Sequence, residues 1–440
     1  MRTNSEELKM NTNIRKKTIA AGLSALLFMT GCAGKTPAQT EPLKHDPAVK
    51  TELKLDQVAN QKFDENKLNG EYGRYSFELM KQIAANAEKN CNIMISPASI
   101  MMALDMCAAG AKAETLKQLS DLFAKDVDPL EQQAFASEMM KRFNASQKIK
   151  FNCANAVWSN DKILNGKVNT TYTDYIKKTF EAEFNSVKFG PSTHKEINKW
   201  VDDKTNHMIP ELLNQPLTED AIMVLVNAIR FEAQWAKGYE DGQVMNMEFY
   251  GIDGETDASM LSSTEKGYFE TDKATGFIKY YEGEEYAFVA ILPKDTKAEA
   301  NDFMKSFTYE DYKKFIDSRS DEDVRALMPE FKSDYGNKLN ETVAKLGVTD
   351  AFDQDKADFS GIADTKDGNF YISEIIHKTH IEVDRKGTKA AAATAVTMKV
   401  AGVAPARKIK EVICNRPYCY AIVDTVSMNP IFIGTVNTVK

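Results

Sequence analysis

The stretch that decides the fold is VDRKGTKAAAATAVTMKVAGVA, residues 383–404. Its alanines favour a helix. Its alternation by two favours a strand, because the parity that runs from Thr388 to Val400 carries no charge, whereas Lys389 and Lys399 occupy the opposite parity. A strand of this kind buries one face and leaves its lysines in water. Because the stretch contains no proline, it is compatible with an exposed loop, a helix or a central strand.

The composition limits the classes of partner. The chain has 440 residues, of which 56 are basic and 64 acidic, for a formal net charge of -8. Nucleic acids and anionic membrane surfaces need a basic footprint, so we expect no nucleic-acid partner. Hydrophobic residues make up 43% and charged residues 27%, as in ordinary globular proteins. Five histidines and no CxxC pair leave little material for a metal site, and we expect neither metal nor cofactor.

The N-terminus has the pattern of an export signal. Basic residues at 15–17 precede an apolar run over 19–29, which is shorter than the roughly 20 residues that cross a bilayer. The sequence MTGC that ends at Cys32 resembles a bacterial lipobox. We therefore expect 1–32 to be a lipoprotein signal peptide with lipid on Cys32. The protein would then be exported and lipid-anchored in the cell envelope, at the periplasmic face or the cell surface.

The rest of the chain mixes helical and strand patterns. Residues 33–64 are rich in proline and polar side chains and are expected to form a flexible tether. Apolar spacings of three or four predict an amphipathic helix over 197–213. Apolar runs at 288–292, 418–423 and 430–434 suit buried strands. The result is an α+β chain, and it contains no nucleophile elbow, dinucleotide loop, phosphate loop or zinc-protease helix, so we expect no enzyme.

Eight motifs in a fixed order resemble those of the serpin family, the serine protease inhibitors. They lie at 92–100, 110–115, 225–235, 328–332, 346–347, 357–362, 387–394 and 429–434. The resemblance covers residues 70 to 440 and implies the serpin fold: three β-sheets, about eight or nine helices and an exposed reactive-centre loop. It also implies a single domain over 65–440 and a monomer.

The resemblance implies a suicide mechanism. A target protease forms an acyl-enzyme on the loop, and the cleaved loop then inserts as a new strand in the central sheet before hydrolysis is complete. A small residue at the scissile position suits elastase-like or subtilisin-like serine proteases, with papain-like cysteine proteases as a further class. The alternative is a non-inhibitory serpin-like binding or chaperone protein.

The resemblance assigns roles to individual residues. The loop hinge comprises Gly387, Thr388, Ala390, Ala391, Ala392, Ala393 and Thr394. The scissile residue usually lies 14 positions after the hinge glycine, which implies a reactive bond between Ala401 and Gly402. Cleavage after Arg407 or Lys408 is the alternative and would require an unusually long inserted segment.

The resemblance also implies two structural clusters beneath the inserting strand. The shutter, a hydrogen-bonded group, comprises Ser96, Ser99, Asn227 and His377, and Trp235 marks the breach where insertion begins. Core packing is the simpler reading of Trp235. One departure concerns Arg385, which stands where the family usually has glutamate, so that any salt bridge there must be rearranged or absent.

Overall fold

The computed structural model describes residues 52–146, 148–218, 220–366, 369–388 and 409–439. Four of the expected features therefore lie outside the described residues: the signal peptide with Cys32, most of the predicted tether, the hinge residues from Ala390 to Thr394, and the Ala401–Gly402 bond.

Part of the segment predicted to be a flexible tether, from residue 52 onward, is packed against the folded body. Glu52 forms a β-bridge with Lys112, Leu53 and Val58 are buried, and a 3₁₀ helix η1 spans Leu55–Asn60. Burial of these apolar side chains offsets the entropy lost when the segment from residue 52 is ordered. The predicted boundary at residue 64 is therefore too late, because residues from 52 onward already belong to the packed body.

Nine α-helices occur in the described part of the chain. They are α1 (Glu65–Asn86), α2 (Pro97–Gly110), α3 (Ala113–Ala124), α4 (Pro129–Ala145), α5 (Thr170–Phe180), α6 (Thr193–Lys204), α7 (Ala300–Ser306), α8 (Tyr309–Asp317) and α9 (Asn340–Lys345). Three further 3₁₀ turns are η2 (Asp161–Ile163), η3 (Asp241–Gln243) and η4 (Asp350–Phe352). The start of α2 follows from the local sequence, because the Ser96 side chain accepts from the Ser99 N–H and Pro97 occupies the first turn.

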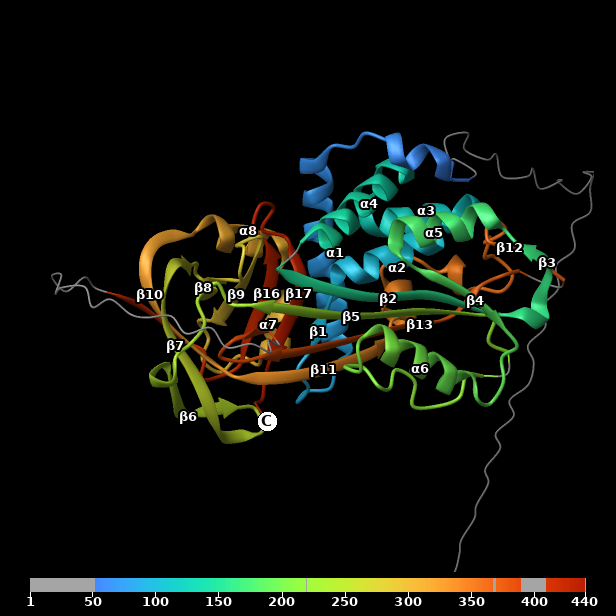
Figure 1. Ribbon diagram of the computed structural model, residues 1–440. Helices are drawn as coiled ribbons and strands as arrows, with labels where there is room; N and C mark the ends of the chain where they lie inside the picture. Colours follow the sequence, from blue (N-terminus) through green and yellow to red (C-terminus); the bar gives the residue numbers. More distant parts are fainter. Residues whose placement is uncertain (1–51, 147, 219, 367–368, 389–408, 440) are drawn as a thin grey trace, which may run out of the picture. The chain divides into compact units, whose positions relative to one another are not determined.

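The six-stranded sheet runs through the middle of the packed body (Figure 1). Its order is β11 (Phe331–Lys338), β13 (Ile372–Val383), β14 (Gly387–Thr388), β5 (Met223–Gln234), β2 (Ile149–Asn160) and β4 (Glu183–Val187). Strands β13 and β5 also pair directly, in parallel. The short β14 enters only at one end of this pair.

Both faces of the sheet are buried, as β5 illustrates. Val224, Val226 and Ala228 pack with α6, whereas Leu225 and Ile229 on the opposite parity join the main core. Figure 1 shows α6 on one side of the sheet and helices α1 to α5 on the other. A strand inserted beside β5 would therefore be buried on both faces.

A nine-stranded sheet forms the second layer. Its strands are β1 (Met94–Ile95), β17 (Pro430–Val436), β16 (Tyr418–Asp424), β9 (Tyr286–Pro293), β8 (Ala274–Tyr280), β7 (Gly254–Glu270), β10 (Ser320–Pro329) and β15 (Lys410–Ile413) in spatial order, with β6 (Val244–Gly251) paired to β7. Strands β3 (Leu164–Val168) and β12 (Ala363–Thr365) form a separate pair. The expected α+β class, with three sheets and nine α-helices in the described residues, is confirmed. None of the helices in the described ranges is both long and apolar enough to cross a membrane.

One predicted helix extends further along the chain than the helix in the structure. The strands expected at 288–292, 418–423 and 430–434 lie in β9, β16 and β17, but the helix expected over 197–213 stops at Lys204. Asn206 and His207 adopt positive φ angles of 53° and 62°, which terminate the helix. Apolar residues after that point, such as Ile209, still pack with α6, and this is why the spacing continued.

Candidate functional site

The candidate site begins with the seam, which we define as the parallel contact between Ile372–His380 of β13 and Met223–Arg230 of β5. Here the two strands are hydrogen-bonded to each other without a strand between them. All four predicted shutter residues meet at the middle of the seam. His377 stands directly opposite Asn227, and the start of α2 brings Ser96 and Ser99 against them.

A continuous set of hydrogen bonds joins these side chains. The Ser96 backbone N–H donates to Nε2 of His377 at 3.3 Å, and Nδ1 of His377 lies 2.5 Å from Oδ1 of Asn227. Nδ2 of Asn227 donates to Oγ of Ser99 at 2.6 Å. Oγ of Ser96 donates to the Ile431 carbonyl at 2.9 Å, which ties the cluster to β17.

The hydrogen bonds define the protonation state of His377. Because Nε2 accepts from a backbone N–H, the ring proton lies on Nδ1 and is donated to Asn227. Complete burial lowers the pKa of His377 from 6.5 to about 3. The imidazole is therefore neutral near pH 7. Its two hydrogen bonds join β13 to Asn227 of β5 and to the start of α2.

The structure adds a member that sequence reasoning missed. Asn155 on β2 is buried, stands opposite Asn227 on the adjacent strand β5, and accepts from its Nδ2 at 2.7 Å. The polar row thus spans three strands, from β13 through β5 to β2. The only sequence signal was an asparagine inside an apolar strand pattern, which by itself does not indicate its partner.

The second part of the site is the mouth, the end of the β13–β5 pair where Gly387 and Thr388 separate the strands. Gly387 pairs with Gln234, and Thr388 pairs with Ala233 of β5 and with Val383 of β13. A Cβ atom on residue 387 would lie 2.1 Å from the Ala233 carbonyl oxygen, so only glycine permits this approach. The chain reverses into β14 over Asp384, whose Oδ1 accepts the Gly387 N–H at 3.0 Å.

Aromatic side chains hold the first hinge residue. The Thr388 side chain is fully buried, and its Oγ1 lies 2.8 Å from the Tyr281 hydroxyl. Trp235 stacks on Tyr281 with ring centroids 4.5 Å apart, and its indole N–H donates to the Asp384 carbonyl at 2.9 Å. Trp235 therefore lies beside the first hinge residues, at the mouth. Tyr281 had no sequence signal that identified it.

A buried lysine completes the mouth. Lys279 is 2% exposed, pairs with Glu265 at 2.7 Å, and lies over the rings of Trp235 and Tyr239. Burial lowers the pKa of Lys279, and the Glu265 carboxylate opposes this shift. Its charge is compensated within the site by Glu265 and by the ring faces.

The Arg385 departure has a structural resolution. Arg385 Nε lies 3.5 Å from Glu330, the residue between β10 and β11, and Nη1 lies 3.1 Å from Asp241. The Arg385 backbone N–H also donates to Glu330 at 3.1 Å. Of the two outcomes expected for Arg385, a rearranged or an absent salt bridge, the structure has an ion pair beside the hinge, with the positive charge on the hinge side.

Comparison with known proteins agrees with this architecture. The family model "Serpin (serine protease inhibitor)" matches residues 71–439. Leukocyte elastase inhibitor A of Mus musculus is 31% identical over 82% of this chain and 97% of its own length. The crystal structure of tengpin, a thermophilic serpin, in its native state superposes with a TM-score of 0.79 at 36% identity, covering 89% of this chain and all of that one.

The same neighbour in another state is less similar. Tengpin in its latent state gives a TM-score of 0.73 over 86% of this chain and the whole of that one, at the same 36% identity. With the family model spanning most of the residues, the chain belongs to the serpin family. Its members are typically protease inhibitors rather than enzymes.

Proposed function

We propose that this serpin is a suicide inhibitor that traps a protease by inserting its cleaved loop into the six-stranded sheet. One observation carries the proposal: β14 pairs antiparallel with both β13 and β5 and so already occupies the first positions of an added strand. The seam beyond it is closed by direct β13–β5 pairing. Insertion would replace the single set of hydrogen bonds between β13 and β5 with two sets, one on each side of the new strand. These additional hydrogen bonds would favour the inserted state.

Continuing the register of β14 gives the inserted strand a specific length. The sixth residue after Thr388 is Thr394, and the sixth residues before Ala233 and Val383 are Asn227 and His377. Thr394 would thus stand between Asn227 of β5 and His377 of β13, at the centre of the seam. The tenth residue, Met398, would stand opposite Met223, where β5 begins. The parity of Thr388 faces the main core, which is the face that needs small, uncharged residues.

This length supports a reactive bond between Ala401 and Gly402. Ala401 lies three positions beyond Met398, so the inserted strand would use the full length of β5 and leave the acyl-enzyme just past its end. Cleavage after Arg407 would leave nine residues beyond that end. The proposed targets are elastase-like or subtilisin-like serine proteases, since their shallow pockets accept alanine.

The direct test is incubation with pancreatic elastase and with subtilisin. We expect a complex that survives SDS, and a released C-terminal peptide that begins at Gly402 by mass spectrometry. The variant Thr388→Arg buries a charge beside Tyr281, and we expect it to be cleaved without forming the complex. Thr388→Ser keeps the hydroxyl and is the matched control that retains complex formation.

Two outcomes would contradict the proposal. A stable complex with Thr388→Arg would mean that the hinge need not enter the sheet. Cleavage of the unaltered chain without any complex would favour a non-inhibitory binding or chaperone protein.

We further propose that the chain is anchored in a bacterial envelope through lipid on Cys32. The proposal rests on the basic, apolar and MTGC pattern of the N-terminus. We expect radiolabelled palmitate to be incorporated into the full chain expressed in a bacterium and to be absent from Cys32→Ala. Cys91→Ala, which changes a cysteine in the folded body, is the control. Equal labelling of Cys32→Ala would exclude this anchor.

A further inference from the structure

Two glutamates flank the point at the mouth where β13 and β5 separate. Direct pairing of the two strands ends with His380 and Arg230, two residues before Glu382 and Glu232. Just beyond the glutamates, Thr388 of β14 already lies between the strands. The position between Glu382 and Glu232, which we call the fork, is therefore the next place where a lengthening β14 would separate β13 from β5.

A row of charged side chains crosses the sheet at the fork. Strand β11 places Lys332 opposite Glu382, and the two side chains form an ion pair at 2.7 Å. On the other side of the fork, β2 places Lys150 opposite Glu232. From β11 to β2 the charges are positive, negative, negative and positive, and the fork lies between the two negative ones. Because opposite charges on neighbouring strands stabilise a sheet and like charges destabilise it, a cation at the fork would make the row alternate in sign.

Both glutamates can accept a further cation. The side chain of Glu382 is 24% exposed and that of Glu232 is 17% exposed, so an added charge pair would be screened less than one in open water. Glu232 already contacts Arg230, but this arginine lies in the next row, opposite His380, and reaches Glu232 along β5 rather than from the fork. A carboxylate has two oxygens and accepts several donors, so this contact does not preclude a second partner.

The sequence supplies a cation for the fork. Thr388 pairs with Ala233 of β5, so the next residue of the same strand would fall between Glu232 and Glu382. That residue is Lys389, which lies outside the described residues. Thr388 is buried and Ala233 belongs to the main core, whereas successive strand residues point to opposite faces. A strand that continued β14 would therefore direct Lys389 to the face that carries the two glutamates.

We propose that the fork receives the side chain of Lys389 during loop insertion, which makes Lys389 a positioning residue for protease trapping. The proposal rests on the proposed inhibitory function, and charge complementarity identifies the occupant. With Lys389 in place the charges would alternate across five strands, through Lys332, Glu382, Lys389, Glu232 and Lys150. These pairs form only once the strand has entered beyond Thr388, so they favour entry over the exposed loop.

The test follows how the acyl-enzyme partitions between trapping and hydrolysis. After reaction with pancreatic elastase, the ratio of cleaved inhibitor to covalent complex is measured on SDS gels. A change at Lys389 leaves the sequence around the proposed Ala401–Gly402 bond intact. We expect Lys389→Glu, which brings three carboxylates together, to raise the ratio about tenfold at an ionic strength of about 0.01 M. Lys389→Arg keeps the charge and should leave the ratio unchanged.

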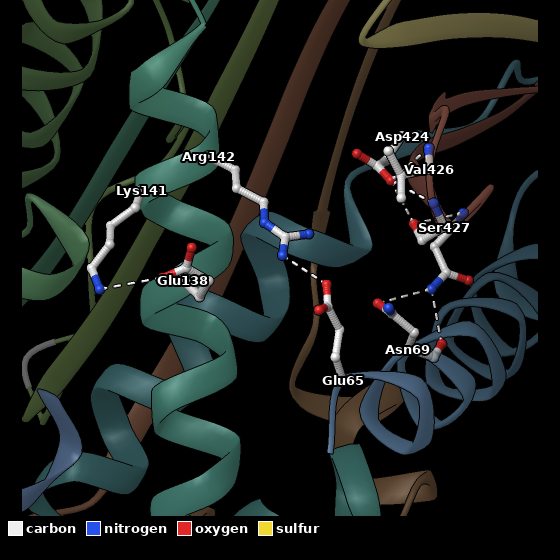
Figure 2. A network of polar contacts seen from close by, with 9 residues as sticks. Glu65, Asn69, Glu138, Lys141, Arg142, Asp424, Val426 and Ser427 are labelled. Atoms are coloured by element: carbon white, nitrogen blue, oxygen red, sulfur yellow. Dashed lines mark hydrogen bonds and ion pairs between the residues drawn. The ribbon is translucent and has the colours of Figure 1, made fainter. Parts of the chain in front are cut away.

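Salt, a second substitution and a control localise the effect. At about 1 M salt, where the Debye length is about 3 Å, the effect of Lys389→Glu should shrink to about twofold. Adding Glu382→Gln to Lys389→Glu removes one repelling carboxylate and should recover about threefold of the loss. The control Lys141→Glu makes the same substitution beside Glu138 on α4, outside the seam and the mouth, and should leave the ratio unchanged (Figure 2).

Melting of the cleaved chain measures strand entry without a covalent complex. Insertion should raise the melting temperature of the unaltered chain after cleavage by a catalytic amount of elastase. Lys389→Glu should reduce that rise by about 2 °C, because the three carboxylates oppose entry at the fork. Lys141→Glu should not change the rise.

The proposal fails if Lys389→Glu gives the same ratio and the same rise as the unaltered chain, or if Lys141→Glu has an equal effect. It also fails if Glu382→Gln recovers nothing in the Lys389→Glu background. Failure of the inhibitory function is a different result: the unaltered chain would be cleaved, and its melting temperature would rise, without any complex. In that case the effect of Lys389→Glu on the rise still decides whether the fork receives Lys389.

Discussion

The seam and the mouth hold the same two strands by different means. At the seam, β13 and β5 are paired directly, and a buried polar row from His377 to Asn155 crosses them. At the mouth, Gly387 and Thr388 separate the strands against the stacked rings of Trp235 and Tyr281. The seam therefore depends on hydrogen bonds that have no replacement in the interior, and the mouth on stacked rings, the buried Lys279–Glu265 pair and the partly exposed Arg385–Glu330 pair.

The two regions would have different roles in the proposed mechanism. Polar groups buried at the seam lose their partners if the strands part, so the seam resists opening until a new strand offers substitutes. The mouth already accommodates a strand and needs no such exchange. Opening should therefore start at the mouth and be limited by the seam.

Acidification should produce the largest effect, and it acts on the seam. His377 has a pKa of about 3 in the folded protein and about 6.5 when unfolded, so the unfolded chain binds more protons between these values. Stability is then lost as the pH falls from 6.5 towards 3, by about 1.4 kcal/mol per pH unit. Urea unfolding at several pH values measures this slope.

The matched variants are His377→Gln and His207→Gln. The first removes the buried titrating group and should flatten the slope, whereas the second removes an exposed histidine and should not. An identical pH profile for His377→Gln and the unaltered chain would contradict a neutral, buried His377.

Removal of the central seam residue should have the next largest effect. Asn227→Ala leaves His377, Ser99 and Asn155 without their partner in the interior. We expect the free energy of unfolding to fall by about 3 kcal/mol. Asn246→Ala on the exposed edge strand β6 is the control and should change it by less than about 0.5 kcal/mol. Equal losses in the two variants would mean that the polar row does not secure the seam.

A smaller effect is expected at the mouth. Tyr281→Phe keeps the stack on Trp235 but removes the hydrogen bond to Thr388. The hinge should be released at a cost of about 1 kcal/mol, seen as faster amide hydrogen exchange at Thr388 while exchange at Asn227 is unchanged. Uniform acceleration at both positions would indicate global destabilisation and would remove the distinction between the two regions.

The smallest effect concerns the reversed ion pair beside the hinge. Glu330 and Arg385 are partly exposed, so a double-mutant cycle with Glu330→Gln and Arg385→Gln should give a coupling of about 0.5 kcal/mol. The double variant that exchanges the two residues, Glu330→Arg with Arg385→Glu, should retain most of this coupling free energy. A coupling above about 2 kcal/mol would mean that this pair is one of the main interactions that stabilise the sheet.

Local patterns were sufficient for much of the fold. The strands β9, β16 and β17 follow from apolar runs, and α2 begins at a serine–proline cap that is visible in the sequence. The same reasoning placed the helix end at 213 instead of Lys204, because apolar spacing continued through a segment that packs without being helical. It also missed the packing of Leu53 and Val58, since a few apolar residues in a short polar stretch give no clear period.

The ordered motifs alone identified the family, the hinge glycine and the residues that meet at the seam, because each is a short pattern with its own local requirement. Tertiary structure alone decided their partners. Asn155 lies 72 residues from Asn227, and Tyr281 lies 107 residues from Thr388. Contacts of this kind are set by strand register and helix packing across the whole chain, and no local pattern of residues encodes them.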